Sequence, residues 1–406
     1  MRNVLFVAPF AFDTTLRFVE AAAVHPDSRL ILLSQDPLEK FPQSIRRRLA
    51  GHWQVSDCLH PGKLVEAVES VTLRFGRPHC LLGTLEHLQV QLGQVRDHLG
   101  IPGMGAEAAD NFRDKARMKT VMRAAGLPCA RHRLLGTEKD AWEFIEEVGY
   151  PIVVKPPAGA GAKATYSINN EAALRDLLAQ SPPHPKRPMM AEEFIRGTEH
   201  SFDGISLGGK LVWHSLTHYL PSALDAVRNP WIQWCVLLPR EIDDPEFDDI
   251  RKTAAQTLDA LGMETGVSHM EWFRRGDGSI AISEVGARPG GAQISKLISY
   301  AHDLHFYRAW AEVMIDGTFT PPERRYATGA AFLRGQGQGR IRNIHGLEQA
   351  QRDIGPLVVE SHLPRPGQFP STSYEGDGFV ILRHPKTEVV KDALHRLISV
   401  VRVELG

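Results

Sequence analysis

The sequence has few cysteines and no long hydrophobic run, and both absences narrow the class of protein. Cys58, Cys80, Cys129 and Cys235 are scattered, without the paired spacing of a metal site or a disulfide framework. We therefore interpret them as reduced thiols in the core of a cytoplasmic protein. The apolar run at residues 4–7 is too short for a secretion signal or a membrane span, and no later run is long enough.

The chain also lacks an excess of charge of either sign. It has 47 lysines and arginines against 48 acidic residues, a formal net charge of −1. We therefore expect neither nucleic acid nor a membrane surface as a partner, and any phosphate must be bound by a local site. A length of 406 residues predicts two or three packed units.

The first of these units has the pattern of a parallel α/β sheet. Buried strands are predicted at residues 4–7, 30–33 and 80–83, with helices at 14–23 and 63–75 between them. Such alternation is typical of a doubly wound fold. Residues 7–12 contain no G-x-G-x-x-G fingerprint, so we do not expect this unit to bind a dinucleotide.

The middle of the chain contains a glycine loop between two strands. A helix is predicted to begin at Asn111, to run through residues 111–119 and to stop before Pro128. The strand at residues 150–156 ends near Lys155, and Gly159, Gly161 and Lys163 follow before a second strand that ends at Ile168. Glycines allow backbone N–H groups to approach a phosphate closely, so this segment is either a phosphate cover or an ordinary hairpin.

Acidic, histidine and tryptophan residues follow in two further segments. Glu199, Ser201 and Asp203 alternate along a predicted strand and share one face. A strand at residues 211–220 places His214 and His218 on a common face, and residues 221–239 have no clear period, which is typical of a lid. For all these side chains the alternative is a solvated turn or ordinary packing.

An antiparallel hairpin is predicted at residues 270–286, where two alternating apolar runs flank the turn Gly276-Asp277-Gly278. Each run carries one glutamate, Glu271 and Glu284. Either both face water from edge strands, or they are buried and need a compensating cation such as Mg²⁺ with nucleotide phosphates. Regular alternation would place Ile282, Glu284 and Gly286 on one face. One long helix is predicted beyond, at residues 293–314.

The order of these motifs resembles that of the ATP-grasp superfamily of carboxylate–amine ligases. The resemblance covers residues 111–293. It implies a doubly wound α/β domain at residues 1–110, a small lobe with the glycine loop at 111–195, and a large lobe at 196–406 with a small α+β unit from about residue 325. The expected fold class is therefore mixed α/β and α+β.

The resemblance also implies roles for individual residues. Two lysines and the glycine loop would contact nucleotide phosphates, a four-residue hinge would meet adenine through backbone groups, and an acid would bind the ribose. The implied ATP-binding residues are Lys115, Lys155, Gly159, Gly161, Lys163, Glu192, Glu193, Phe194, Ile195 and Glu199. Glu271 and Glu284 would hold Mg²⁺, with Mn²⁺ as an alternative, and Arg288 would be the catalytic cation.

One position departs from the pattern. The superfamily usually has an asparagine two residues after the second metal glutamate, and this chain has Gly286, which offers no side-chain oxygen. One coordination position must then fall to water or a substrate oxygen, or stay empty. Further substrate contacts are expected from His214, His218, Arg228, Trp231, Trp234, His269, Gly290 and Gly291.

The sequence thus predicts an ADP-forming ligase that joins a small carboxylic acid to an amine, most plausibly amino acids or small peptides. Two alternatives stay open. One is a purine-pathway ligase of the same superfamily, such as a formate-dependent one, and the other is a nucleotide-binding protein without activity. A homodimer is the default expectation for the assembly.

Overall fold

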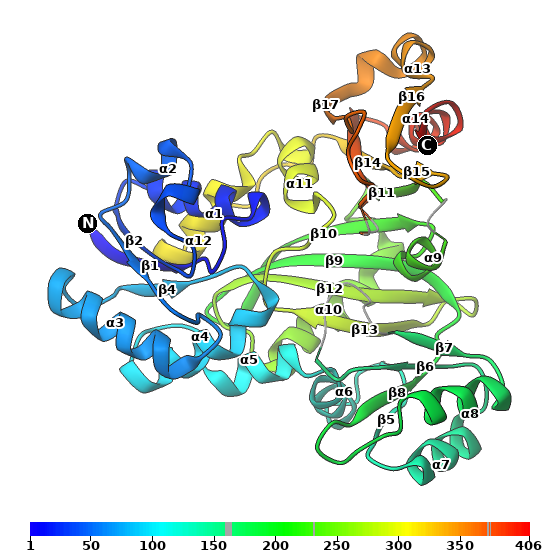
Figure 1. Ribbon diagram of the computed structural model, residues 1–406, viewed down its shortest axis with the longest axis horizontal. Coiled ribbons are helices and arrows are strands. Elements are labelled where there is room, and N and C mark those ends of the chain that lie inside the picture. Colours follow the sequence, from blue (N-terminus) through cyan, green and yellow to red (C-terminus); the bar gives the residue numbers. More distant parts are fainter. Residues whose placement is uncertain (159–164, 230–231, 372, 374) are drawn as a thin grey trace.

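The computed structural model describes residues 1–158, 165–229, 232–371, 373 and 375–406. Its amino-terminal unit is a parallel sheet with the strand order β3-β2-β1-β4 (Figure 1). The predicted strands and helices are present, so the prediction of a parallel α/β start is confirmed. The elements are β1 (Arg2–Val7), α1 (Asp13–Val24), β2 (Ser28–Ser34), η1 (Leu38–Lys40), α2 (Gln43–Arg46), β3 (Gly51–Gln54), α3 (Pro61–Phe75), β4 (Cys80–Leu82), η2 (Glu86–Leu88), α4 (Gln89–Leu99) and α5 (Ala106–Arg113).

The small lobe, by which we mean residues 132–193, contains a four-stranded antiparallel sheet in the order β5-β8-β6-β7. The strands that flank the glycine loop, β6 and β7, pair as the predicted hairpin. The helices of the lobe lie below its sheet in Figure 1. Its elements are β5 (His132–Leu135), α7 (Glu138–Val148), β6 (Ile152–Lys155), β7 (Tyr166–Ile168), α8 (Glu171–Gln180) and β8 (Met189–Glu193).

Helix α6 (Lys115–Ala124) leads into the small lobe but packs elsewhere. Met118 and Met122 belong to the hydrophobic cluster that contains Met270 and Ile282 of the large sheet. The helix also begins later than predicted, because Asp114 interrupts the chain between α5 and α6. Its carboxylate accepts hydrogen bonds from the N–H groups of Ala116 and Arg117, the usual role of an aspartate before a helix.

The large sheet has eight strands in the order β13-β12-β9-β10-β11-β14-β18-β17, and each neighbouring pair is antiparallel. A small sheet in the order β15-β19-β16 lies near the carboxyl end. The strands are β9 (Gly197–Leu207), β10 (Lys210–Leu220), β11 (Trp234–Leu238), β12 (Gly266–Arg275), β13 (Ile280–Gly286), β14 (Ala327–Leu333), β15 (Gly335–Gln336), β16 (Ile341–His345), β17 (Val358–His362), β18 (Gly378–His384) and β19 (Arg402–Leu405).

Helices cover and connect these strands (Figure 1). They are α9 (Ala223–Arg228), η3 (Pro245–Phe247), α10 (Asp248–Leu261), α11 (Ile294–His302), α12 (Phe306–Asp316), α13 (Leu347–Ile354), η4 (Gly355–Leu357) and α14 (Thr387–Val400). Within the described residues, every helix is too short or too polar to cross a lipid bilayer. The domain boundaries expected near residues 110 and 195 stay predictions.

Two segments differ from the sequence-based expectation. The single helix predicted at residues 293–314 is two helices, because Asp303 adopts a left-handed conformation with φ 49° and ends α11. The aperiodic segment at residues 221–239 is not one lid: it contains α9 and the fully buried strand β11. A strand inside a sheet is buried on both faces, so it lacks the alternation that sequence analysis looks for.

The predicted hairpin is present as β12 and β13, but with a bulge. Glu271 lies opposite Glu284, whereas the next residue, Trp272, lies opposite Ile282, so β13 has one extra residue. The extra residue turns Ile282 away from Glu284 and into the hydrophobic cluster. The prediction that Ile282 and Glu284 share a face is therefore wrong.

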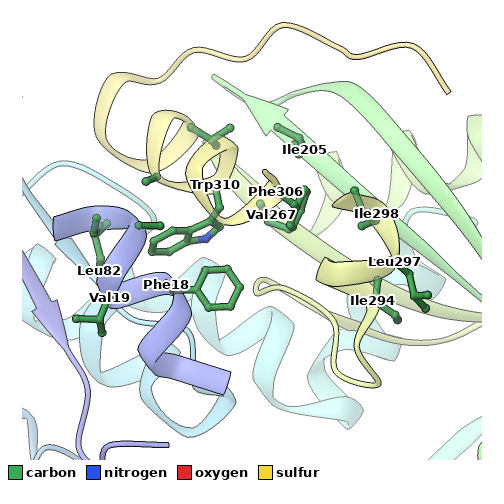
Figure 2. Packing of buried hydrophobic residues seen from close by; sticks show 14 of the residues in the cluster. Phe18, Val19, Leu82, Ile205, Val267, Ile294, Leu297, Ile298, Phe306 and Trp310 are labelled. Carbon is green, nitrogen blue, oxygen red and sulfur yellow. The ribbon is translucent and has the colours of Figure 1, made fainter. Parts of the chain in front are cut away.

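One hydrophobic cluster joins the amino-terminal unit to the large sheet. Phe18 of α1 packs edge-on against Trp310 and Tyr307 of α12, with ring centroids 5.0 and 4.9 Å apart. Figure 2 shows Phe18 facing Trp310, with side chains of α11 and the large sheet close by. Because the cluster also includes Phe6 of β1 and Ile205 of β9, the two units share one core.

Candidate active site

A cavity of about 1080 Å³ lies where the three parts of the chain meet. Its wall is formed by α1 and η2 of the amino-terminal unit, by β6 and β8 of the small lobe, and by β12 and β13 of the large sheet. The structure brings most of the predicted nucleotide, metal and catalytic residues to this wall: Lys115, Lys155, Glu192, Glu193, Phe194, Ile195, Glu199, Glu271, Glu284 and Arg288.

The two hairpin glutamates face each other at the cavity. Burial and the nearby charge of Glu284 raise the pKa of Glu271. Burial would raise the pKa of Glu284 as well, but Lys115 and Lys155 outweigh it and lower that pKa; the Lys115 ammonium lies 2.8 Å from Glu284 Oε1. The two carboxylates lie opposite each other and are partly buried, so they repel each other when both are charged. A further cation between them would offset this repulsion.

The chemistry of this pair fits Mg²⁺ shared with a nucleotide. Within the part of the chain that the structure describes, no group of three or more His, Cys, Asp or Glu side chains forms a metal cluster. Mg²⁺ is usually bound by one or two carboxylates together with water and phosphate oxygens, so it does not need a larger protein cluster. The metal role of Glu271 and Glu284 stays a prediction that this arrangement supports.

A buried carboxylate between two lysines, Glu192, lies on the same cavity wall as the two hairpin glutamates. Glu192 Oε1 lies 2.5 Å from the ammonium of Lys155, and its Oε2 lies 3.3 Å from that of Lys119. Burial opposes ionisation of Glu192, but the two lysines together lower its pKa to about 2. Burial likewise opposes the charge of Lys155, while Glu192 and Glu284 raise the pKa of that lysine. Lys155 is therefore held charged in the interior.

Three residues of the predicted hinge, Glu193, Phe194 and Ile195, line the cavity. The carboxylate of Glu193 forms ion pairs with Arg131 and Arg275, at 2.7 and 2.8 Å. Both of its oxygens are therefore engaged by protein side chains. Glu199 accepts a 2.7 Å hydrogen bond from the N–H of Ala223 at the start of α9. Burial and the charge of Glu271 raise the pKa of Glu199 to about 8.

Arg288 is held in place by a residue from another unit. Its Nε donates a 2.5 Å hydrogen bond to Glu86 Oε2, and one terminal nitrogen donates to the carbonyl oxygen of Pro289. Burial would lower the pKa of Arg288, but Glu86 raises it, so the guanidinium stays charged. A Cβ placed on Gly286 would lie 3.3 Å from Glu86 Oε2. The carboxylate of Glu86 therefore fills the space next to the position where the superfamily usually has asparagine.

His269 forms a buried pair with Asp203 at the same wall. Its Nδ1 lies 2.8 Å from Asp203 Oδ1, and its Nε2 lies 3.9 Å from Glu271 Oε1. A Cβ on Gly290 would approach both His269 and Asp203 to less than 3 Å, so only glycine fits there. Gly290 and Gly291 also line the cavity, so the structure brings together these three substrate candidates.

Other substrate candidates lie elsewhere. His218 pairs with His200, and the ring of His214 stacks on Phe202, both on the face of β10 that turns away from the cavity. The structure therefore does not bring these two histidines to the cavity wall, and their contact with substrate stays a prediction. Arg228 lies at the exposed end of α9, outside the cavity wall.

Trp234 does line the cavity, but its main contacts are within the protein. Its ring stacks on Phe332 at 5.2 Å, and its indole N–H donates to the carbonyl oxygen of Pro221. The remaining candidates, Gly159, Gly161, Lys163 and Trp231, lie outside the described residues.

Sequence reasoning missed Lys119 and Glu86. Lys119 was detectable, because it stands four residues after Lys115 and the two share a face of α6. Glu86 gives no such signal: it lies 202 residues before its partner Arg288, in the unit that was interpreted as unable to bind a dinucleotide.

Replacing Glu192 by glutamine should destabilise the protein by about 3–5 kcal/mol, because two buried lysines would lose their counter-charge. The pKa of Glu192 is held at about 2, against 4.5 for a free glutamate. Its contribution is therefore complete above pH 4.5 and is lost as the pH falls toward 2. Urea unfolding at pH 7, 5 and 3.5 should show that the difference in the free energy of unfolding between wild type and Glu192→Gln is smallest at the lowest pH.

The control is Glu143→Gln, which changes a partly exposed glutamate of the same lobe. It should change the free energy of unfolding by less than about 1 kcal/mol. An equally small effect of Glu192→Gln would contradict this account.

Replacing Gly286 by asparagine, the residue that the superfamily usually has there, should lower the catalytic activity of this protein. The new side chain would press on Glu86 Oε2 and disturb the pair that orients Arg288. We expect Gly286→Asn to lower kcat/KM by about tenfold or more, since misplaced catalytic groups lose rate steeply. Gly276→Asn is a matched control in the turn of the same hairpin, where a Cβ meets nothing within 4 Å. Unchanged or higher activity of Gly286→Asn would show that Glu86 does not set the position of Arg288.

Comparison with known proteins identifies a domain in the middle of the chain. The model of the ATP-grasp domain matches residues 120–292, the part of the chain that carries the hinge, both hairpin glutamates and Arg288. An L-arginine-specific L-amino acid ligase of Bacillus subtilis is 25% identical over 320 residues, which cover 77% of this chain and 76% of that protein.

Solved structures show the same fold. The L-amino acid ligase from Bacillus licheniformis aligns over 100% of this chain and 99% of its own, with a TM-score of 0.78 and 18% identity. The N5-carboxyaminoimidazole ribonucleotide synthetase from Thermotoga maritima aligns over 100% of both chains, with a TM-score of 0.71 and 16% identity. The chain therefore carries an ATP-grasp domain at residues 120–292, a domain of ATP-dependent carboxylate–amine ligases, and is similar to an L-amino acid ligase over most of its length.

Proposed function

We propose that this enzyme joins an amino acid or small peptide, activated at its carboxylate, to the amino group of a second small molecule. The observation that carries the proposal is the arrangement in one cavity of two opposed carboxylates, Glu271 and Glu284, with the cations Lys115, Lys155 and Arg288. That arrangement suits a reaction between two anions, a triphosphate and a carboxylate, whose repulsion must be offset by positive charge.

The first step is the transfer of the γ-phosphoryl group of ATP to the carboxylate. An oxygen of the carboxylate forms the new P–O bond while the bond to the β-phosphate oxygen breaks, which gives an acyl phosphate and ADP. Lys115 and Lys155 bind and orient the phosphates in this proposal. Mg²⁺, held by Glu271 and Glu284, would neutralise phosphate charge. The carbonyl carbon then has phosphate as its leaving group in place of oxide.

The second step is attack by the amine on the carbonyl carbon of the acyl phosphate. The C–N bond forms, the C–O bond to phosphate breaks, and the amine gives up a proton. Arg288 and the N–H groups near Gly290 and Gly291 lie on the same wall and are suited to stabilise the oxyanion of the tetrahedral intermediate. Exclusion of water from the cavity would protect the acyl phosphate from hydrolysis.

The choice of amino acids as substrates is supported by relatives rather than by the pocket alone. The Bacillus subtilis relative is named for its action on L-arginine and other L-amino acids, and it matches three quarters of this chain. At 25% identity the specificity for arginine need not be shared, so we propose the broader class of amino acids and small peptides.

The test is the release of ADP and phosphate from Mg²⁺-ATP with pairs of amino acids. Release should require both an acid and an amine, and Glu284→Gln should lower it by at least about 100-fold, because a transition-state charge loses its partner. Glu107→Gln, whose side chain is 88% exposed, should leave the rate unchanged. The proposal fails if no pair of amino acids stimulates release, or if Glu284→Gln behaves like the control.

A second candidate is a purine-pathway reaction. It is favoured by the similarity of the whole fold to a ribonucleotide synthetase. In that case formate or bicarbonate, together with a phosphoribosyl amine, should stimulate ADP release, whereas amino acids should not. Tight binding of ATP without turnover in any mixture would instead favour a nucleotide-binding protein without activity.

A further inference from the structure

The cavity extends well beyond the ATP machinery, into a region whose residues the proposed chemistry does not use. This far end is formed by α1, α11, α12, β17 and β18, on the side of the amino-terminal unit and the carboxyl-terminal strands. Its wall contains Arg17, Lys296, Tyr307, Glu360 and Phe379. Because one end of the cavity is suited to ATP and the activated acid, the far end is the space left for the amine substrate.

Lys296 is the most unusual residue of the far end. Its side chain is only 5% exposed, and its ammonium pairs with the carboxylate of Glu360 and lies 4.5 Å from the centre of the Phe379 ring. Among the described residues, Glu360 is its one hydrogen-bond partner, although an ammonium carries three donors. A buried ammonium with unused donors at a cavity wall is suited to bind an anionic group.

Glu360 does not fully balance the positive charge around it. Its second oxygen accepts a 3.1 Å hydrogen bond from the hydroxyl of Tyr300, so both oxygens are engaged. The guanidinium of Arg17 lies 5.9 Å from the centre of the Tyr307 ring, on the same wall. The pKa of Lys296 is lowered, because burial and the nearby positive charge of Arg17 together outweigh the effect of Glu360.

Two other acids on the wall lie apart from this group. Asp13 is exposed at the first position of α1. Glu375 is bound to the N–H of Ala292 and to the side chain of Gln293, just before α11 begins. Neither forms an ion pair with Lys296 or Arg17 within the described residues, so the positive group faces the cavity with Glu360 as its partner.

The elements that carry Arg17 and Lys296 are fixed against each other. Next to Arg17, Phe18 packs on Trp310, and next to Lys296, Leu297 and Ile298 belong to the same buried cluster (Figure 2). The two cations therefore stand on a wall held by the core that joins the amino-terminal unit to the large sheet. A preorganised site of this kind loses little side-chain entropy when it binds a ligand.

We propose that Lys296, with Arg17 beside it, anchors an anionic group, a carboxylate or a phosphate, on the amine substrate. This rests on the proposed ligase function, because it assigns the far end of the cavity to the second substrate. A carboxylate is what an amino acid would bring, and a phosphate is what a phosphoribosyl amine would bring. Lys296 would thus select amines that carry a negatively charged group.

Three amine probes test the proposal by calorimetry in the presence of ADP and Mg²⁺: L-alanine, its uncharged amide L-alaninamide, and 2-aminoethyl phosphate. Wild type should bind the carboxylate or the phosphate probe about 10- to 100-fold more tightly than the amide, the range of a charge-assisted hydrogen bond. Tighter binding of L-alanine indicates a carboxylate ligand, and tighter binding of 2-aminoethyl phosphate indicates a phosphate ligand. Lys296→Met should abolish the preference over the amide, and Lys296→Arg should restore part of it.

The controls separate a binding role from a structural one. Lys252→Met removes an exposed lysine of α10 and should keep the full preference. If Lys296→Met does not fold, Arg17→Met gives a second variant, which should reduce the preference without disturbing a buried group. Equal binding of all three probes by wild type, no binding of any probe, or an unchanged preference in Lys296→Met would overturn the proposal.

The experiments give a different result if the proposed ligase function is wrong than if the proposed role of Lys296 is wrong. In that case no acid and amine pair would release phosphate from ATP, yet the calorimetric preference for anionic probes and its dependence on Lys296 would persist. If turnover is observed, Lys296→Met should raise the KM for the charged amine by about tenfold or more while the KM for ATP stays the same. An equal rise in both would indicate a structural role and overturn the assignment.

Discussion

The cavity depends on the opposition of Glu271 and Glu284 across two antiparallel strands. Two carboxylates that face each other repel each other, and each resists even partial burial. The surrounding structure must therefore supply positive charge. Lys115 supplies part of it by direct contact with Glu284, and Lys155 adds more while it is held by Glu192. Each of these lysines comes from a different element, so α6 and β6 both bring positive charge to one hairpin.

The same balance explains how the site can accept ATP. In the structure the lysines are neutralised by protein carboxylates, and a triphosphate would exchange those partners for its own oxygens. Such an exchange does not expose an isolated charge in the interior, because each ammonium keeps an anionic partner throughout. The Glu86–Arg288 pair extends this network to the amino-terminal unit. That unit, although it has no dinucleotide fingerprint, thereby contributes a charged side chain to the cavity.

Much of this arrangement could be predicted from the sequence, because its motifs are local. The hairpin and the strand that ends at Lys155 each depend on a few consecutive residues, and the structure contains both. The residues of the predicted hinge also follow one another in the sequence. What could not be predicted depends on contacts between distant segments. The bulge in β13 depends on its partner strand, the side of the sheet that His214 and His218 occupy depends on the register with β9, and Glu86 meets Arg288 only after folding. Lys119 is different, since its helical spacing from Lys115 was readable and was overlooked.

The distribution of hydrophobic clusters has a mechanical consequence. The small lobe has a cluster of its own, drawn only from residues between Leu135 and Ala191, whereas the amino-terminal unit shares its largest cluster with the large sheet. A rotation of the small lobe would leave every member of its cluster in contact with its neighbours, while the same rotation of the amino-terminal unit would pull Phe18 from Trp310. The small lobe, which carries Lys155, is therefore the part whose rotation would break the fewest hydrophobic contacts, and the amino-terminal unit moves only together with the large sheet.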